Sequence, residues 1–227
     1  MHEPTSFRRP PQVRFAVLEK KWRDWLLSWV KRQAGWAATF IDESWFVLWP
    51  RGSSCWAERK RPWRIPKAKS WTKGKTPPST CLYADLDAET RDVTGEWHET
   101  WNQQETGQHL KGVIRRYAAH GVRFLVVFWD HAPWHVADRL RRLVARYNRS
   151  AKRHGRLRVL LFRLPKKAPW LMPLEAVFGQ TKRAVGPIER KSMPALQQAV
   201  ERRLERRNAW AREGLQDEHS STPLLSA

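Results

Sequence analysis

Three acidic residues lie at the ends or edges of predicted elements, where their carboxylates could work together. Asp42 lies in the first predicted strand, Asp130 ends the most apolar strand, and Glu175 lies in the first turn of a helix after a proline-rich run. Because sites in mixed sheets collect beyond strand ends, we expect the three to face one crevice. Converging carboxylates repel one another unless a cation neutralises them, and oxygen ligands suit Mg²⁺ or Mn²⁺. Two such ions held together suit phosphoryl transfer.

Each acid also has an ordinary structural explanation. Asp42 beside Glu43 fits a solvated strand edge, and Asp130 fits the cap of a following helix. Glu175 is favoured by the dipole at the start of its helix. Taken one residue at a time, these explanations are at least as good as the catalytic one, so the surrounding sequence has to decide.

The elements that must position these acids follow from periodicity. Apolar residues at helical spacing predict an amphipathic helix from Phe15 to near Gly35. β-Branched and aromatic residues predict a first strand at 37–50, and 80–97 predicts a strand, a polar turn and a further short strand, with 55–63 as another candidate strand. Then come a helix at 98–120, a buried strand at 122–130, a helix at 134–149, a strand at 157–164, and helices at 173–185 and 194–212.

This order predicts an α/β fold with a mixed sheet flanked by helices, in which three antiparallel strands precede two parallel ones. We expect three segments in the chain: an N-terminal basic amphipathic arm (1–35), a catalytic domain (36–190), and a C-terminal helix with a disordered tail (191–227).

The sequence motifs around the acids resemble those of the catalytic domain of the IS630/Tc1/mariner transposase superfamily, and those of the IS630 group most closely. The first block is "FIDESWFVLWP" and the second is "VVFWDHAPWH". The third block is the most specific, and the residues that it keeps in register are Leu164, Pro165, Pro169, Leu171, Pro173, Glu175, Phe178 and Lys182. The resemblance runs from about Thr39 to Lys182.

The resemblance implies an RNase H-like fold in which Asp42, Asp130 and Glu175 form a DDE site for two Mg²⁺ or Mn²⁺ ions. It implies cleavage and strand transfer of double-stranded DNA at transposon ends and target, by a dimer or larger assembly. Around the site we expect Glu43, His131 and His135 in supporting positions. The chain departs from the family at His131 and Met172, where asparagine is usual, and in the longer spacing between the last two acids.

The charge of the chain favours a polyanionic partner. It has 43 Lys and Arg against 22 Asp and Glu, a net charge of +21. Nucleic acid is the expected partner, although ribosomal, membrane-surface and merely soluble basic proteins share this composition. The cations that we expect to contact phosphate are Lys60, Arg61, Lys73 and Lys75 in a basic loop, Lys166 and Lys167 in the proline-rich run, and Lys182 and Arg183 on the helix after it.

Two further expectations concern the context of the chain. Family members usually carry an N-terminal helix-turn-helix region that binds transposon ends. With some thirty residues before the first strand, we expect this chain to lack that region. It would then be the downstream product of a split reading frame, a truncated copy, or a catalytic half that works with an end-binding partner or an upstream half. Cys55 and Cys81 have no metal-ligand spacing, and no signal segment is evident, which predicts a reducing, cytoplasmic setting. The resemblance to the IS630 group implies a bacterial, nucleoid-associated protein.

Two other functions remain open at this point. The chain could be a catalytically decayed or repurposed DNA-binding protein, or an RNase H-like nuclease without strand transfer. Fold alone does not separate these functions. Binding of Mn²⁺ separates an enzyme from a binder, and the joining of DNA strands separates a transposase from a nuclease.

Overall fold

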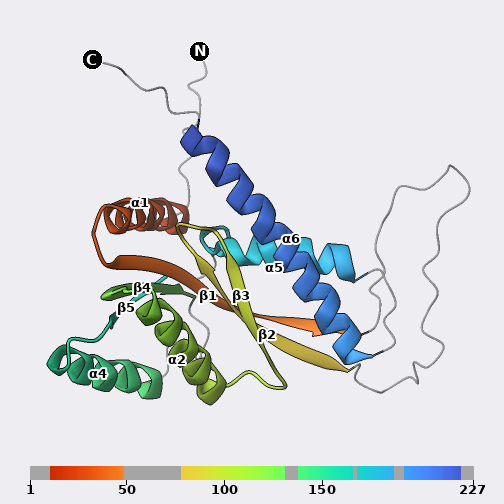
Figure 1. Ribbon diagram of the computed structural model, residues 1–227, viewed down its shortest axis with the longest axis horizontal. Helices are drawn as coiled ribbons and strands as arrows, with labels where there is room; N and C mark the ends of the chain where they lie inside the picture. The colour runs from red at the N-terminus through yellow and green to blue at the C-terminus, as the bar shows by residue number, and fades with distance from the viewer. Residues whose placement is uncertain (1–10, 49–77, 131–137, 166–167, 187–191, 221–227) are drawn as a thin grey trace, which may run out of the picture.

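A five-stranded mixed sheet forms the centre of the molecule (Figure 1). A computed structural model describes residues 11–48, 78–130, 138–165, 168–186 and 192–220. The strands are β1 (Trp36–Val47), β2 (Ser79–Asp87), β3 (Val93–His98), β4 (Phe124–Trp129) and β5 (Arg158–Arg163), in the spatial order β3-β2-β1-β4-β5. β1 pairs antiparallel with β2, and β2 with β3, whereas β1 pairs parallel with β4, and β4 with β5. The predicted mixed sheet is confirmed, and the candidate strand at 55–63 lies outside the described residues.

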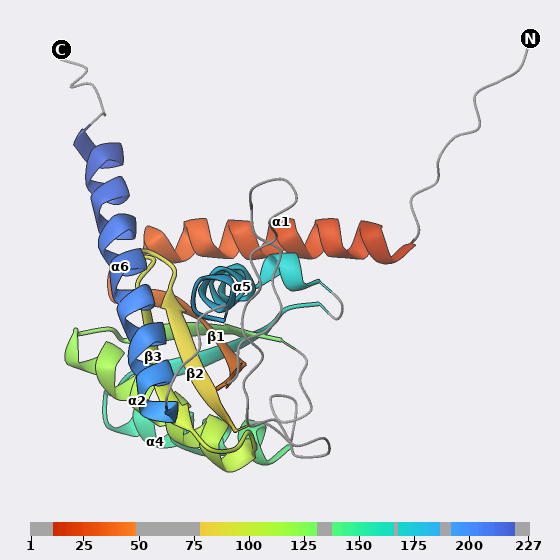
Figure 2. The ribbon, with the colours of Figure 1, turned by 90° about the vertical axis from the view of Figure 1, so that its right-hand side faces the viewer.

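Helices cover both faces of this sheet (Figures 1 and 2). The helices are α1 (Pro11–Lys31), α2 (Gln103–Ala119), α4 (Asp138–Arg153), the 3₁₀ turn η1 (Pro169–Leu171), α5 (Pro173–Val185) and α6 (Met193–Ser220). α6 runs to Ser220, eight residues past the predicted end at Arg212, because Gly214 lowers helix propensity without ending a helix that contains no proline after Pro194. Within the described stretches, no helix is long and apolar enough to cross a membrane.

Two apolar clusters hold the helices on the sheet. On one face, Phe40 and Phe46 of β1 share a cluster with residues of α5 and α6, and Val30 of α1 belongs to it too. On the other face, Ile41 of β1 packs with residues of α2 and α4. β4 contributes to both clusters, through Phe128 to the first and through its neighbours in the strand to the second. β4, which was predicted at 122–130 from an apolar run without alternation, is therefore a central strand buried on both faces.

The turn between α1 and β1 sets the register of the sheet. Gly35 has φ of +76°, and its carbonyl accepts hydrogen bonds from the N–H groups of Arg123 and Phe124. A side chain here would be strained in φ and would lie 2.9 Å from Nε of Arg123. The glycine therefore fixes where β1 begins relative to β4, and β4 starts at Phe124 as the partner of Trp36.

The start of α2 gives the first testable prediction. Asn102 Oδ1 accepts hydrogen bonds from the backbone N–H groups of Gln104 and Glu105. Replacing Asn102 by alanine leaves these donors without their side-chain acceptor, so we expect a loss of about 1 kcal/mol in the free energy of unfolding, measured by urea denaturation. Asn102→Asp keeps the acceptor and should lose little. Equal losses in both variants would contradict the capping role.

Candidate active site

The register of β1 against β4 places two of the three predicted acids side by side. The last paired residues of the parallel strands are Phe40 and Phe128. Asp42 and Asp130 each lie two residues farther along, so both side chains continue the face that Phe40 and Phe128 occupy. Asp42 is buried at 8% exposure and accepts a hydrogen bond from the backbone N–H of Glu43 at 2.9 Å. Asp130 follows the last residue of β4 and is half-buried.

α5 brings the third acid to the same face. Leu174 and Phe178 are buried in the cluster that contains Phe40, which fixes this helix over the sheet. Pro173 occupies the first turn of the helix, where its missing N–H costs nothing. Glu175 follows in the same turn and is exposed. The proline-rich run therefore leads to an exposed carboxylate in the first turn of a helix that packs on this cluster.

The electrostatics of Asp42 show that the acids act on one another. Burial raises the pKa of Asp42 well above its ordinary value, and the neighbouring carboxylates of Glu43, Asp130 and Glu175 raise it further. The hydrogen bond from the N–H of Glu43 opposes this change but does not cancel it. The structure therefore brings all three predicted acids into one electrostatic group, in which each added negative charge is unfavourable.

The chemistry of this group fits a divalent cation. Its donors are carboxylate oxygens, the ligands that Mg²⁺ and Mn²⁺ prefer, and a cation would relieve the repulsion that raises the pKa of Asp42. As the described side chains stand, no three acidic, histidine or cysteine residues are close enough together to hold an ion.

The other predicted site residues divide into those that the structure places and those outside the described residues. Lys182 is half-buried on α5, with Nζ 5.6 Å from the ring centre of Phe46, on the face that carries Asp42. Arg183 is exposed beside it. Glu43 is half-buried, and strand alternation directs it to the opposite face. The predicted residues that lie outside the described stretches are Lys60, Arg61, Lys73, Lys75, His131, His135, Lys166 and Lys167.

A second group of charged residues was not predicted from the sequence. It lies under α2, on the face opposite Asp42, around the buried carboxylate of Asp85. Arg116 donates a hydrogen bond to Asp85, and Nε2 of the buried His109 lies 3.8 Å from the same carboxylate. Burial raises the pKa of Asp85 although Arg116 and His109 act to lower it. The sequence holds only part of the signal: His109 and Arg116 are seven residues apart on one helix face, but no local pattern pairs that face with Asp85.

Comparisons with known proteins agree with this geometry. Residues 37–197 match the family of DDE superfamily endonucleases. The fold is similar to the Mos1 mariner paired-end complex with Mg, with a TM-score of 0.60 and 18% identity over 95% of this chain and 61% of that chain. The catalytic domain of Mos1 mariner transposase matches with a TM-score of 0.56 and 18% identity over 95% of this chain and 90% of that one. No curated protein matches the chain in sequence.

The match to the family includes Asp42, Asp130 and Glu175 and covers more than half of the chain. The solved structures show the expected RNase H-like fold, while the chain spans about three fifths of the full Mos1 chains that it matches. The chain belongs to the DDE superfamily endonucleases, as the resemblance of its motifs to the IS630/Tc1/mariner transposases predicts.

Proposed function

We propose that the chain is the catalytic part of a DNA transposase, which cleaves a DNA phosphodiester to expose a 3′-hydroxyl and joins that hydroxyl to target DNA. The observation that supports this most is the convergence of Asp42, Asp130 and Glu175 on one face of an RNase H-like sheet. The proposed catalytic unit is 36–190, with α1 and α6 packed against its core.

In this proposal Asp42, Asp130 and Glu175 hold two Mg²⁺ or Mn²⁺ ions. Mos1 mariner paired-end complexes solved with Mg and with Mn support an ion of this class. Such ions, when bound, polarise the attacking hydroxyl and stabilise the leaving oxygen of the phosphodiester. In this proposal the protein's own contribution is positioning: β1 and β4, paired up to Phe40 and Phe128, hold the two aspartates that follow near each other, and α5 carries Glu175 in its first turn. A metal ligand at this position is the ionised carboxylate, and the raised pKa of Asp42 means that the protein alone disfavours this form.

The proposed partner is double-stranded DNA. Lys182 and Arg183 follow Glu175 by two turns on α5, so a phosphate beside the acids lies within the field of their charges. Lys166, Lys167 and the basic loop with Lys60, Arg61, Lys73 and Lys75 are further proposed contacts. We also propose a dimer or larger assembly on DNA and a cytoplasmic, nucleoid-associated location. The Mos1 paired-end complex with a transposon end supports the proposed assembly on DNA.

Supercoiled plasmid and Mn²⁺ test the proposal directly. The purified chain should convert plasmid to nicked or linear forms with Mn²⁺ and not with EDTA, and Asp130→Asn should abolish the conversion. Glu99→Gln, at an exposed acid that directly follows the edge strand β3, is the matched control and should retain activity. Calorimetry should detect Mn²⁺ binding to the wild type and weaker binding to Asp130→Asn.

The products distinguish the open alternatives. DNA binding without Mn²⁺ binding or cleavage would identify a non-catalytic DNA-binding protein. Cleavage without joining, even with a cut DNA end supplied as the attacking strand, would identify a nuclease. Joined products that depend on Asp130 are the result expected of a transposase.

A further inference from the structure

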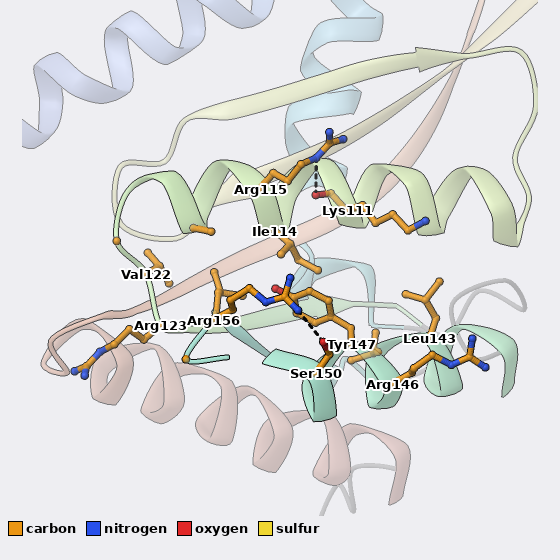
Figure 3. A pocket seen from close by; sticks show the side chains of 15 residues that line it. Lys111, Ile114, Arg115, Val122, Arg123, Leu143, Arg146, Tyr147, Ser150 and Arg156 are labelled. Atoms are coloured by element: carbon orange, nitrogen blue, oxygen red, sulfur yellow. Dashed lines mark hydrogen bonds between the residues drawn. The ribbon is translucent and has the colours of Figure 1, made fainter. Parts of the chain in front are cut away.

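A groove of about 1150 Å³ opens between α2 and α4, on the face of the sheet opposite the catalytic acids (Figure 3). The floor of the groove is apolar. Ile114, Val144 and Leu157 are buried there, and Leu143 and Tyr147 are half-buried. The volume exceeds the range of about 300–1,000 Å³ that is common for small-molecule sites. A segment of a macromolecule therefore suits it better than a metabolite.

The rim of this groove is cationic. Lys111 and Arg115 come from α2, Arg146 from α4, and Arg123 and Arg156 from the turns that precede β4 and β5 (Figure 3). All five are exposed, and none of the described residues that line the groove is acidic. Among the residues that the structure describes, none of the five forms an ion pair. Arg156 donates a hydrogen bond to the hydroxyl of Ser150, and Arg115 a long one to the carbonyl of Lys111. The rim charges are thus available to carboxylates or phosphates.

The combination of floor and rim favours one kind of occupant. Duplex DNA contacts cations and makes no use of an aliphatic floor. Single strands use aromatic stacking, for which the described lining residues offer only the half-buried Tyr147. A second copy of the chain carries a charge of +21 and is repelled at long range. A helix with an apolar face between acidic flanks matches both parts of the groove.

We propose that the α2–α4 groove docks an acidic amphipathic helix of a partner protein. Its apolar side chains lie on Ile114, Leu143 and Tyr147, and its carboxylates meet the rim cations, foremost Arg115 and Arg146. The site is separated from Asp42 by the sheet, so a bound partner leaves the catalytic face open. The proposal is independent of the catalytic function proposed above.

A labelled model peptide tests the proposal. The probe is a fluorescein-labelled helix of about 18 residues, long enough to be helical in water, with leucines at i, i+3, i+4 and i+7 and glutamates on both flanks. Its control has the same composition in scrambled order. Fluorescence anisotropy with the full chain should show binding of the ordered peptide, and binding of the scrambled one should be at least about fivefold weaker, since it lacks an apolar face.

Protein variants locate the site. Arg115→Glu with Arg146→Glu should weaken binding of the ordered peptide at least about tenfold, because both lost charges face its carboxylates. Arg149→Glu makes the same kind of change at an exposed position of α4 outside the groove and should weaken binding less than about twofold. Circular dichroism of the variants checks that the exposed substitutions leave the fold intact.

Three results would overturn the proposal. The first is equal binding of the ordered and scrambled peptides, which would show that charge alone attracts them. The second is an equal loss in Arg149→Glu, which would place binding elsewhere. The third is a lower affinity of the double variant for a blunt DNA duplex, with its peptide binding unchanged. This result would identify the groove as a nucleic-acid-binding surface.

Discussion

Asp42→Asn is expected to abolish DNA cleavage and to make the fold more stable. The loss of activity follows from the proposed role: a ligand for divalent ions that contribute several kcal/mol to the reaction is lost, and we expect a decrease of at least about 10³-fold in the nicking rate. The gain in stability follows from the raised pKa of Asp42. Burial and the nearby carboxylates of Glu43, Asp130 and Glu175 make the charged form of Asp42 unfavourable in the folded state, which lowers the free energy of unfolding.

The pH dependence has a definite sign. The pKa of Asp42 is higher in the folded than in the unfolded state, so folding favours the protonated carboxyl. The stability that this contributes is present at low pH and is lost as the pH rises from the ordinary value of 3.8 through the raised pKa. Asparagine carries no charge at any pH and retains an oxygen for the N–H of Glu43. The melting temperature of the variant should therefore exceed that of the wild type at pH 8 in EDTA, by about 2–4 °C for each kcal/mol relieved.

Thermal denaturation between pH 5 and pH 8 measures this difference, which should narrow toward the acid end. Adding Mn²⁺ at pH 8 should raise the melting temperature of the wild type and leave that of Asp42→Asn nearly unchanged, since ligand binding to the folded state stabilises it. Glu99→Gln is the matched control and should follow the wild type throughout. A variant that is active, or that is less stable than the wild type at pH 8 without metal, would contradict the account of Asp42.

Most of the fold could be predicted because each element has its own local signal. β4 was predicted as a central strand from an apolar run without alternation, and α5 from Pro173 and the helical spacing after it. The convergence of the acids was a weaker inference, because it depends on the pairing of Phe40 with Phe128, a register that no local pattern specifies. Gly35 contributes to that register through a contact with β4, nearly ninety residues away in the chain.

The features that the sequence did not reveal are those made by two elements together. Asp85 could be expected to point inward from its strand, but its partners Arg116 and His109 come from a helix whose rotation about its axis is set by packing. The α2–α4 groove likewise depends on how far two helices stand apart. Arg115 and Arg146 lie on separate helices, and their shared surface exists only in the folded chain.

Arg116→Met is expected to destabilise the protein by about 3 kcal/mol, because it leaves a buried carboxylate without its cation. Asp85 is 3% exposed and receives a hydrogen bond from Arg116, which is itself 32% exposed, so the loss should lie at the lower end of the range for buried pairs. The remaining groups around Asp85 are His109, which acts to lower its pKa, and Asp87, which acts to raise it. Without Arg116 the pKa of Asp85 rises further, and the carboxyl takes up a proton more readily.

The sign of the pH effect separates this mechanism from simple loss of packing. A carboxyl with a raised pKa in the fold destabilises the protein as the pH rises, so the deficit of Arg116→Met should be larger at pH 8 than at pH 5. Urea denaturation at both pH values measures it. Adding Asp85→Asn to Arg116→Met should recover part of the loss, because the unpaired charge is gone. Arg115→Met, an exposed neighbour on the same helix, should change the free energy of unfolding by less than about 0.5 kcal/mol. If the deficit is the same at both pH values and Asp85→Asn recovers nothing, Arg116 stabilises the fold through its aliphatic contacts and not through the charge of Asp85.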